Sequence, residues 1–329
     1  RLALLSEIPD RWIAAVRRWS GLNEKHRRKG WPDRNAEYLF YQTLVGAWPL
    51  SLDRALAYME KAAREAKQHT DWIEPNRHYE AALRDFVAGA MGDPAFTGDV
   101  ELFVAPLIRA GHLNSLAQTL LKLTAPGVPD FYQGTELWDF SLVDPDNRRP
   151  VDFDHRRASL AGVQDGVASG ALPDFADEVL RDSADGRVKL FLTRQVLHYR
   201  GFHPELFRKG RYVPISVSGQ CARHVCAFAR VFGRRRTITV VPRLIVGLTR
   251  SLDIWPLGEE VWRDTRLLLP ETRQGHEFQN LLTGERHRVQ IENNRPGLRL
   301  GEILVRFPLA LVDDLPPRVS RPRKESKQR

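Results

Sequence analysis

The sequence lacks the features that define several large protein classes. Its 329 residues include only two cysteines, which excludes a disulfide framework and favours a reducing cytoplasmic location. No apolar run reaches the ~18 residues that a membrane-spanning helix needs, so we expect no membrane partner. The motifs Gly-x-Gly-x-x-Gly, Gly-x-Ser-x-Gly, His-Glu-x-x-His and the P-loop are absent. Their absence argues against nucleotide binding, a serine hydrolase and a zinc protease.

One short motif could in principle bind a metal. Cys221, His224 and Cys226 would supply three ligands, but no nearby Cys or His completes a tetrahedral set. These residues lie in a strand-like stretch, and cysteine often behaves as a small buried hydrophobe. We therefore interpret them as core residues and expect neither a metal nor a cofactor.

The formal net charge of +9 raises nucleic acid as a possible partner. Residues 318–329 contain six basic side chains and one acidic one, which is +5 and leaves +4 for the rest of the chain. A short basic end is usually solvated and disordered, and no zinc finger or RNP-type motif accompanies it. We predict a disordered basic tail over 316–329 and no nucleic-acid partner. Salt-sensitive binding that disappears on deletion of residues 318–329 would show otherwise.

The first part of the chain has helical periodicity. Between residues 51 and 66 the apolar side chains recur at i, i+3, i+4 and i+7, which predicts an amphipathic helix. Similar patterns predict further helices over residues 36–48, 76–91, 100–109, 113–123, 154–170 and 187–199.

From about residue 212 the pattern changes to short strands. Alternating or β-branched segments are separated by Gly, Pro or charged turns, which predicts an antiparallel β-domain. The predicted strands cover residues 213–217, 224–232, 237–241, 286–291 and 298–307. Residues 126–134 form a short apolar run between turn residues directly after a helix, and this run predicts one further, buried strand.

The richest group of polar and aromatic side chains follows that predicted buried strand. Such residues can hydrogen-bond sugar hydroxyls or stack on a pyranose ring, although an ordinary surface loop with Asp–Arg pairs has the same composition. The candidate substrate-binding residues are Tyr132, Gln133, Glu136, Trp138, Asp144, Asp146, Asn147 and Arg148. Secondary candidates are Lys67, His69 and Trp72.

The same region carries a family resemblance. Residues 126–153 read PGVPDFYQGTELWDFSLVDPDNRRPVDF, and their beginning resembles the last barrel strand of α-amylase-family enzymes. The whole string is similar to the maltooligosyltrehalose synthase family. Residues 41–49, 65–67, 70–76 and 224–230 are similar to other parts of the same family, so the resemblance covers most of residues 1–311.

The resemblance implies a fold of mixed class, α/β plus all-β. We expect the C-terminal part of a (β/α)8 barrel with a helical insertion, followed by an antiparallel β-domain. The expected division is a helical insertion with late barrel helices over 1–125 and the last barrel strand, substrate loop and closing helices over 126–204. The β-domain would follow over 205–315. Because the sequence begins at Arg1 in the middle of a helical pattern, we also expect an upstream segment.

The resemblance also implies an activity. Enzymes of this family convert the terminal α-1,4 link of a maltooligosaccharide into an α,α-1,1 link, with retention at the anomeric carbon. Retention requires two carboxyl groups about 5 Å apart. The family's catalytic carboxylates are expected upstream of Arg1, and no motif here matches them, so we assign no catalytic residue. We expect the chain alone to be inactive and its partner to be a maltooligosaccharide or a glycogen-derived α-1,4-glucan.

Two other functions remain open at this point. An α-glucan hydrolase of the α-amylase family would release free sugar, because water rather than the tethered glucose would attack. A non-catalytic glucan-binding module would bind starch saturably through residues 205–315 alone.

Overall fold

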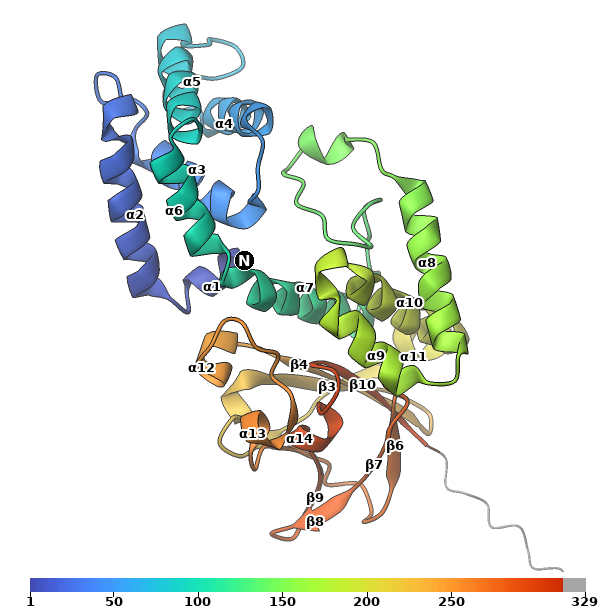
Figure 1. The fold of residues 1–329 in the computed structure, drawn as a ribbon. Helices are drawn as coiled ribbons and strands as arrows, with labels where there is room; N and C mark the ends of the chain where they lie inside the picture. Colours follow the sequence, from blue (N-terminus) through green and yellow to red (C-terminus); the bar gives the residue numbers. More distant parts are fainter. Residues whose placement is uncertain (316–329) are drawn as a thin grey trace, which may run out of the picture.

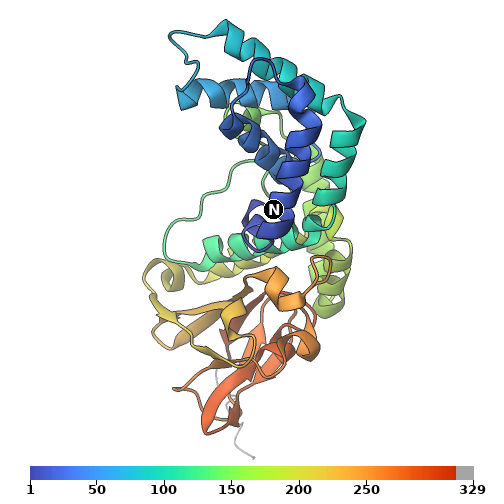
Figure 2. The same cartoon turned by 90° about the vertical axis from the view of Figure 1, so that its left-hand side faces the viewer.

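The computed structural model describes residues 1–315, so the prediction of a disordered basic tail lies outside the described residues. Figure 1 shows a helical bundle at the upper left, a second helical group at the right and a β-region below. Figure 2 shows these parts stacked along one direction, with the β-region at one end. Within residues 1–315, every helix is too short or too polar to cross a membrane.

The N-terminal bundle forms because short polar caps start amphipathic helices. The Asp33 side chain accepts hydrogen bonds from two backbone N–H groups at the start of α3, and the Asn76 side chain accepts one from the N–H of Tyr79 at the start of α5. The helices are α1 (Leu2–Leu5), α2 (Pro9–Asn23), α3 (Arg34–Ala47), α4 (Leu52–Ala66), α5 (Arg77–Met91), α6 (Pro94–Val104) and α7 (Leu107–Thr124), with a 3-10 turn η1 (Glu24–His26). The helices predicted over 36–48, 51–66 and 76–91 are confirmed as α3, α4 and α5.

The helix predicted over 100–109 is wrong in its bounds. The chain leaves α6 after Val104 and starts α7 at Leu107. Pro106 precedes α7 and has no N–H group to continue the hydrogen-bond ladder of α6. The helix α7 that follows has 18 residues, and it packs against α1, α10 and β4. It therefore connects the N-terminal bundle to the rest of the molecule.

A second helical group follows a long irregular segment. It contains α8 (Phe153–Ala168), α9 (Leu172–Arg181), α10 (Arg187–Phe202) and α11 (Pro204–Arg208), with 3-10 turns η2 (Asp146–Arg148) and η3 (Ser183–Asp185). The helices predicted over 154–170 and 187–199 are confirmed as α8 and α10.

The β-region is built from two antiparallel sheets. A six-stranded sheet has the order β1-β3-β4-β10-β6-β7, and a four-stranded sheet has the order β2-β5-β9-β8. The strands are β1 (Arg211–Pro214), β2 (Val217–Ser218), β3 (Val225–Phe232), β4 (Arg235–Pro242), β5 (Arg266–Leu268), β6 (Glu277–Asn280), β7 (Arg286–Arg288), β8 (Gln290–Glu292), β9 (Arg295–Arg299) and β10 (Ala310–Asp314). Short helices lie between them, namely η4 (Ala222–His224), α12 (Ile245–Thr249), α13 (Gly258–Trp262) and α14 (Leu300–Ile303).

The central strands β4 and β10 of the six-stranded sheet are buried on both faces, whereas the outer strands β1 and β7 are largely exposed. Successive side chains of a strand point to opposite faces. Along β10, Leu311 therefore joins the core that contains the helices, whereas Ala310 and Val312 belong to a second core inside the β-region. The helices and the β-region thus share one continuous apolar layer.

The buried strand predicted over 126–134 is wrong. This segment is irregular, and Val128 is 95% exposed. Two prolines, Pro126 and Pro129, remove hydrogen-bond donors, and Gly127 has a φ of 127°. Within residues 1–315 no other strand pairs with this segment, and an unpaired strand has no partners for its backbone groups.

The strand predicted over 298–307 is also wrong in part. β9 ends at Arg299 and the chain continues as the short helix α14. Leu300, Ile303 and Leu304 are all buried, and their spacing at i, i+3 and i+4 places them on one face of a helix. The apolar run was therefore helical rather than extended.

Candidate functional site

The eight main candidate residues lie on the irregular segment between α7 and α8. This segment lies beside α4 (Figure 1). Because this segment has no strand or long helix of its own, side chains from neighbouring helices hold it in place. Three clusters of contacts do this, and they are centred on Asp146, Glu136 and Trp138.

Asp146 is fixed by α4. The guanidinium group of Arg54 donates from Nε to Oδ1 and from Nη2 to Oδ2, both at 2.8 Å. The same Nη2 donates to the carbonyl oxygen of Phe140 at 2.7 Å, and the backbone N–H of Leu142 donates to Asp146 at 2.6 Å. The hydrogen bonds from Arg54 hold the pKa of the Asp146 carboxyl below its ordinary value. Asp146 therefore stays charged and anchors the loop.

The residues on either side of Asp146 lie nearer to solvent. Asp144 forms an ion pair with Arg148, and its carbonyl oxygen accepts a hydrogen bond from Lys61 of α4. Asn147 is exposed. The Asp144 and Arg148 side chains are both about half exposed or more, so they can also reach a ligand.

Glu136 has a structural partner. Its carboxylate accepts hydrogen bonds from the backbone N–H of Gly134 at 3.0 Å and from Nε of Arg156 at 3.2 Å. Arg156 also donates to the carbonyl oxygen of Gly134 at 2.7 Å. The pair closes a turn in the loop. Gln133 and Tyr132, which precede this turn, are exposed.

Trp138 is held by neighbours on two elements. Its ring stacks on His112 of α7 with centroids 4.0 Å apart and an angle of 9°, and its Nε1–H donates to the carbonyl oxygen of Ser183 at 2.7 Å. Burial lowers the pKa of His112 to about 4, so its imidazole is neutral near pH 7. Burial also lowers the pKa of Lys189, whose ammonium lies 5.9 Å from the Trp138 ring, to about 8.

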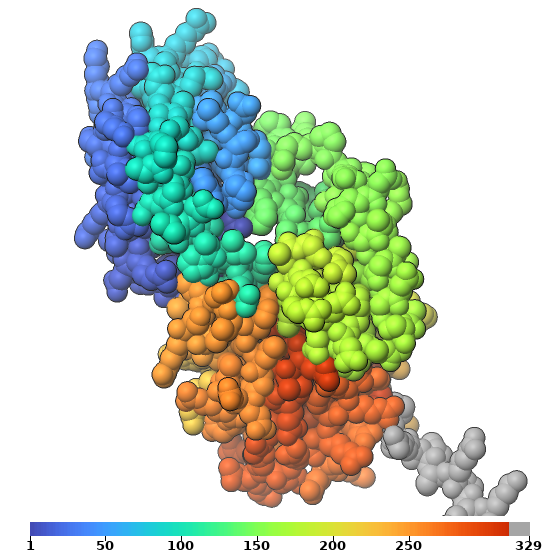
Figure 3. All heavy atoms as spheres, in the orientation of Figure 1, coloured from blue at the N-terminus to red at the C-terminus, as the bar shows by residue number. Residues whose placement is uncertain are grey.

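Two hollows adjoin these clusters. A cavity of about 420 Å³ has Trp138, His112, Phe140 and Arg156 in its wall. A groove of about 630 Å³ lies between α4 and the loop, and its walls include Lys61, Asp144 and Trp72. We call the second hollow the α4 groove. Figure 3 shows α4 and the green loop facing each other on the molecular surface.

Of the three secondary candidates, only Trp72 lies in the α4 groove. Trp72 lines the α4 groove, with the guanidinium group of Arg64 at 4.8 Å from its ring centroid. His69 points elsewhere, because its Nε2 lies 3.4 Å from the Asp33 carboxylate and its ring lies 4.9 Å from that of Tyr79. Lys67 is exposed at the end of α4, in a left-handed conformation. The structure therefore brings Trp72 together with Asp144 but leaves His69 outside the groove.

Sequence reasoning missed the residues that hold the loop. Arg54, Lys61, His112, Arg156 and Lys189 all contact it. Arg54 and Asp146 are 92 positions apart, and no spacing or motif connects them.

The Cys-x-x-His-x-Cys motif is not arranged as a metal site. Nδ1 of His224 lies 2.8 Å from the carbonyl oxygen of Leu244, and its Nε2 accepts a hydrogen bond from Nε of Arg223 at 3.0 Å. Both ring nitrogens are thereby occupied. Among residues 1–315, no group of three or more His, Cys, Asp or Glu side chains is placed to hold a metal ion.

Solved structures share this architecture. The structure of maltooligosyltrehalose synthase from Arthrobacter ramosus superposes with a TM-score of 0.72 and 35% identity, over 94% of this chain and 36% of that one. Another, hypothetical maltooligosyl trehalose synthase from Sulfolobus tokodaii gives a TM-score of 0.61 and 26% identity, over 94% of this chain and 35% of that one. These neighbours confirm the mixed fold of helices and antiparallel sheets.

A curated relative agrees. A Mycobacterium tuberculosis (strain H37Rv) protein named maltooligosyl trehalose synthase is 33% identical over 286 residues, which is 84% of this chain. The chain is homologous to the maltooligosyltrehalose synthases. It spans about a third of the length of these relatives, 33% of the Mycobacterium protein and 36% of the Arthrobacter one. No protein-family model matches the sequence.

Homology to the maltooligosyltrehalose synthases agrees with the family resemblance carried by residues 126–153.

Proposed function

We propose that this chain is part of a maltooligosyltrehalose synthase and forms one wall of its glucan-binding site. The whole enzyme would convert the terminal α-1,4 link of a maltooligosaccharide into an α,α-1,1 link by intramolecular transglycosylation, in trehalose biosynthesis. The observation that carries this proposal is the α4 groove, which combines an exposed Trp72 with polar side chains of α4 and of the loop.

The chemistry of the groove suits a neutral sugar. The aromatic ring of Trp72 offers a flat face for the C–H groups of a pyranose. Lys61 and Asp144 supply a donor and an acceptor for hydroxyl groups. Because Arg54 fixes Asp146 and thereby the loop, these groups are positioned before a ligand arrives, which reduces the ordering cost of binding.

We assign the candidate residues two kinds of role. Asp146 and Glu136 position the loop, since each is already bound to an arginine. Tyr132, Gln133, Asp144, Asn147 and Arg148 are exposed or half-exposed and would hydrogen-bond or stack on the glucan. Trp138 would form a wall of the adjoining 420 Å³ cavity. Lys67 and His69 have no place in this scheme, because they neither belong to the loop of residues 125–152 nor line the α4 groove.

We assign no catalytic acid to this chain. Retaining chemistry needs a nucleophilic carboxylate and a carboxylic acid about 5 Å apart on either side of the scissile bond. The proposed contribution of these residues is to bind and orient the glucan and to keep water away from the detached glucose. Hydrolysis in place of transfer would follow if water could enter.

We propose that residues 1–204 pack against the strands of an α-amylase-type barrel, with 1–125 as helical insertion and late barrel helices and 126–204 as substrate loop and closing helices. Residues 205–315 would be the β-domain. A cytoplasmic location fits an enzyme that acts on maltooligosaccharides or glycogen-derived glucan.

The test is to titrate the purified chain with maltopentaose by isothermal calorimetry and to analyse the mixture for non-reducing sugar. We expect saturable binding without product. Trp72→Ala should weaken binding at least tenfold, whereas Ile73→Ala, whose side chain is exposed outside the groove, should not. No binding by the folded chain would overturn the proposal. Free glucose or trehalose would instead favour a hydrolase with its own acids.

A further inference from the structure

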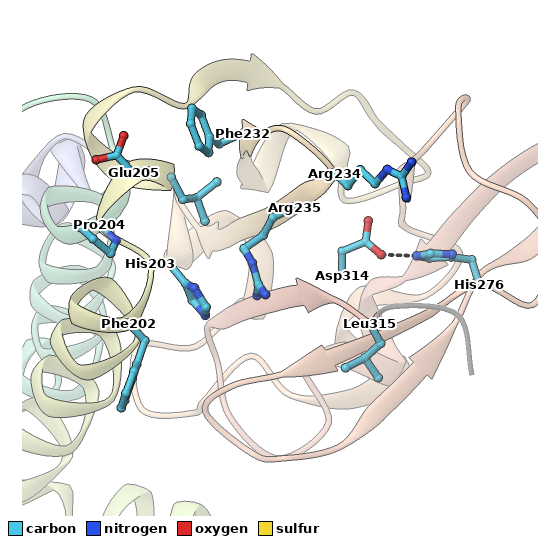
Figure 4. A pocket seen from close by; sticks show the side chains of 11 residues that line it. Phe202, His203, Pro204, Glu205, Phe232, Arg234, Arg235, His276, Asp314 and Leu315 are labelled. Carbon is cyan, nitrogen blue, oxygen red and sulfur yellow. Dashed lines mark hydrogen bonds and ion pairs between the residues drawn. The ribbon is translucent and has the colours of Figure 1, made fainter. Parts of the chain in front are cut away.

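A separate pocket of about 650 Å³ lies where α10 and α11 meet the six-stranded sheet (Figure 4). Its walls come from the junction between the two helices, from the turn between β3 and β4 and from the end of β10. α10 has 16 residues, which corresponds to about 24 Å. Lys189, beside Trp138, lies near one end of this helix and Phe202 is its last residue, so the pocket is remote from the candidate site.

Two phenylalanines expose their rings at this pocket. Phe202 is 69% exposed and Phe232 is 42% exposed, although both are large apolar side chains. They come from different elements, since Phe202 ends α10 and Phe232 ends β3. Their faces are available to a ligand with C–H groups.

The polar floor between them is rigid. Asp313 accepts hydrogen bonds from the hydroxyl groups of Tyr199 at 2.5 Å and Thr237 at 2.8 Å, and from Nη1 of Arg235 at 2.8 Å. Figure 4 shows the Arg235 and His203 side chains near each other inside the pocket. The guanidinium group is thus held in one orientation, with donors that remain for a ligand.

The charges in the pocket are almost all balanced. Arg235 is paired with Asp313, Asp314 is paired with Arg236 at 3.3 Å, and Glu205 is paired with Lys209 at 2.6 Å. Burial and the nearby Arg235 lower the pKa of His203, which favours its neutral form, able to donate and to accept. The carboxylates would repel a bound anion, and the arginines would repel a bound cation. A neutral polyhydroxy ligand avoids both repulsions.

We propose that this pocket, which we call the α10 pocket, is a second binding site for the glucose units of an α-1,4-glucan. The inference rests on the proposed function of the α4 groove. Phe202 and Phe232 stack on pyranose rings, and Arg235, His203 and Glu205 hydrogen-bond hydroxyl groups. A site at the far end of α10 retains a long glucan such as glycogen while a chain end occupies the groove, and short oligosaccharides gain little from it.

The test uses affinity electrophoresis of the whole chain in gels containing glycogen, together with calorimetry with maltopentaose. Phe202→Ala/Phe232→Ala is expected to weaken retardation by glycogen at least fivefold and to leave the Trp72-sensitive binding of maltopentaose unchanged. Ile291→Ala removes an exposed apolar side chain of β8 outside the pocket and serves as the matched control. Circular dichroism and the melting temperature verify that each variant is folded.

Other outcomes are distinguishable. Unchanged retardation of the folded double variant would overturn the second site while leaving the groove intact. Retardation that is lost in Trp72→Ala alone would also overturn it. An increase in melting temperature with inorganic phosphate, abolished by Arg235→Gln, would show an anion site instead. If neither glycogen nor maltopentaose binds to the wild-type chain, the proposed function itself fails.

Discussion

The guanidinium group of Arg54 grips the carboxylate of Asp146 with two hydrogen bonds of 2.8 Å, although the residues lie 92 positions apart. The pair connects the N-terminal bundle to the loop of residues 125–152, and both side chains are largely shielded from water. A bidentate contact of this kind fixes the direction of the loop as well as its distance from α4.

Removing this contact should loosen the loop. Arg54→Ala leaves Asp146 without its partner, and we expect it to lower the free energy of unfolding by about 2 kcal/mol and to weaken maltopentaose binding. Arg54→Lys keeps the positive charge but cannot form the bidentate pair of hydrogen bonds. Its free energy of unfolding should therefore lie between those of the wild type and Arg54→Ala. Urea unfolding followed by circular dichroism measures the first effect.

The matched control is Arg157→Ala, which removes an arginine from an exposed ion pair with Asp154. We expect no measurable loss of stability, because exposed ion pairs contribute little. Equal losses in the Arg54 and Arg157 variants would contradict the role given to Arg54.

His112 should make stability depend on pH. Its folded pKa of about 4 is lower than the ordinary value of about 6.5, so between these values the unfolded chain binds the proton and the folded chain does not. Stability therefore falls as the pH drops from 6.5 towards 4, by about 3 kcal/mol in total for this group. We expect His112→Gln to flatten this part of the pH profile, as measured by urea unfolding at several pH values.

His78 gives the comparison for this measurement, because it is an exposed histidine of α5. The variant His78→Gln should keep the wild-type pH profile. If the pH profile of His112→Gln equals that of the wild type, burial of this imidazole is not the cause of the fall in stability between pH 6.5 and 4.

The aromatic ring of Trp138 should contribute to the affinity for maltopentaose. We expect Trp138→Ala to weaken maltopentaose binding at least tenfold, because it removes the stacked partner of His112 and one wall of the 420 Å³ cavity. Trp138→Phe keeps an aromatic ring and loses only the hydrogen bond to Ser183, so its affinity should stay within about threefold, roughly 0.7 kcal/mol. Calorimetry with maltopentaose on both variants separates the contribution of the aromatic ring from that of the hydrogen bond to Ser183. Similar losses of affinity in Trp138→Ala and Trp138→Phe would contradict the role given to the aromatic ring.

Local patterns predicted much of this fold. The apolar stripe of α4 follows from its residues, because Ala55 and Met59 recur at helical spacing and are buried. The predicted strand over 224–232 became β3, since β-branched and alternating residues suit a sheet. These elements depend on neighbours within a few residues.

The parts that failed depend on distant partners. Residues 126–134 have the composition of a buried strand, but a strand requires another strand beside it, and none pairs with it within residues 1–315. The same limit applies to the site. The candidate residues were recognisable by type, whereas the contacts of Arg54 with Asp146 and of His112 with Trp138 arise only when the chain is folded.

The most direct test of the central claim is the affinity of the chain for maltopentaose before and after the double substitution Trp72→Ala/Asp144→Asn. We expect the wild-type chain to bind maltopentaose saturably and the affinity to fall at least tenfold in the double variant. The control Ile73→Ala/Asp154→Asn, changed at exposed positions outside the α4 groove, should bind normally. Equal affinity of the wild type and the folded groove variant would contradict the central claim.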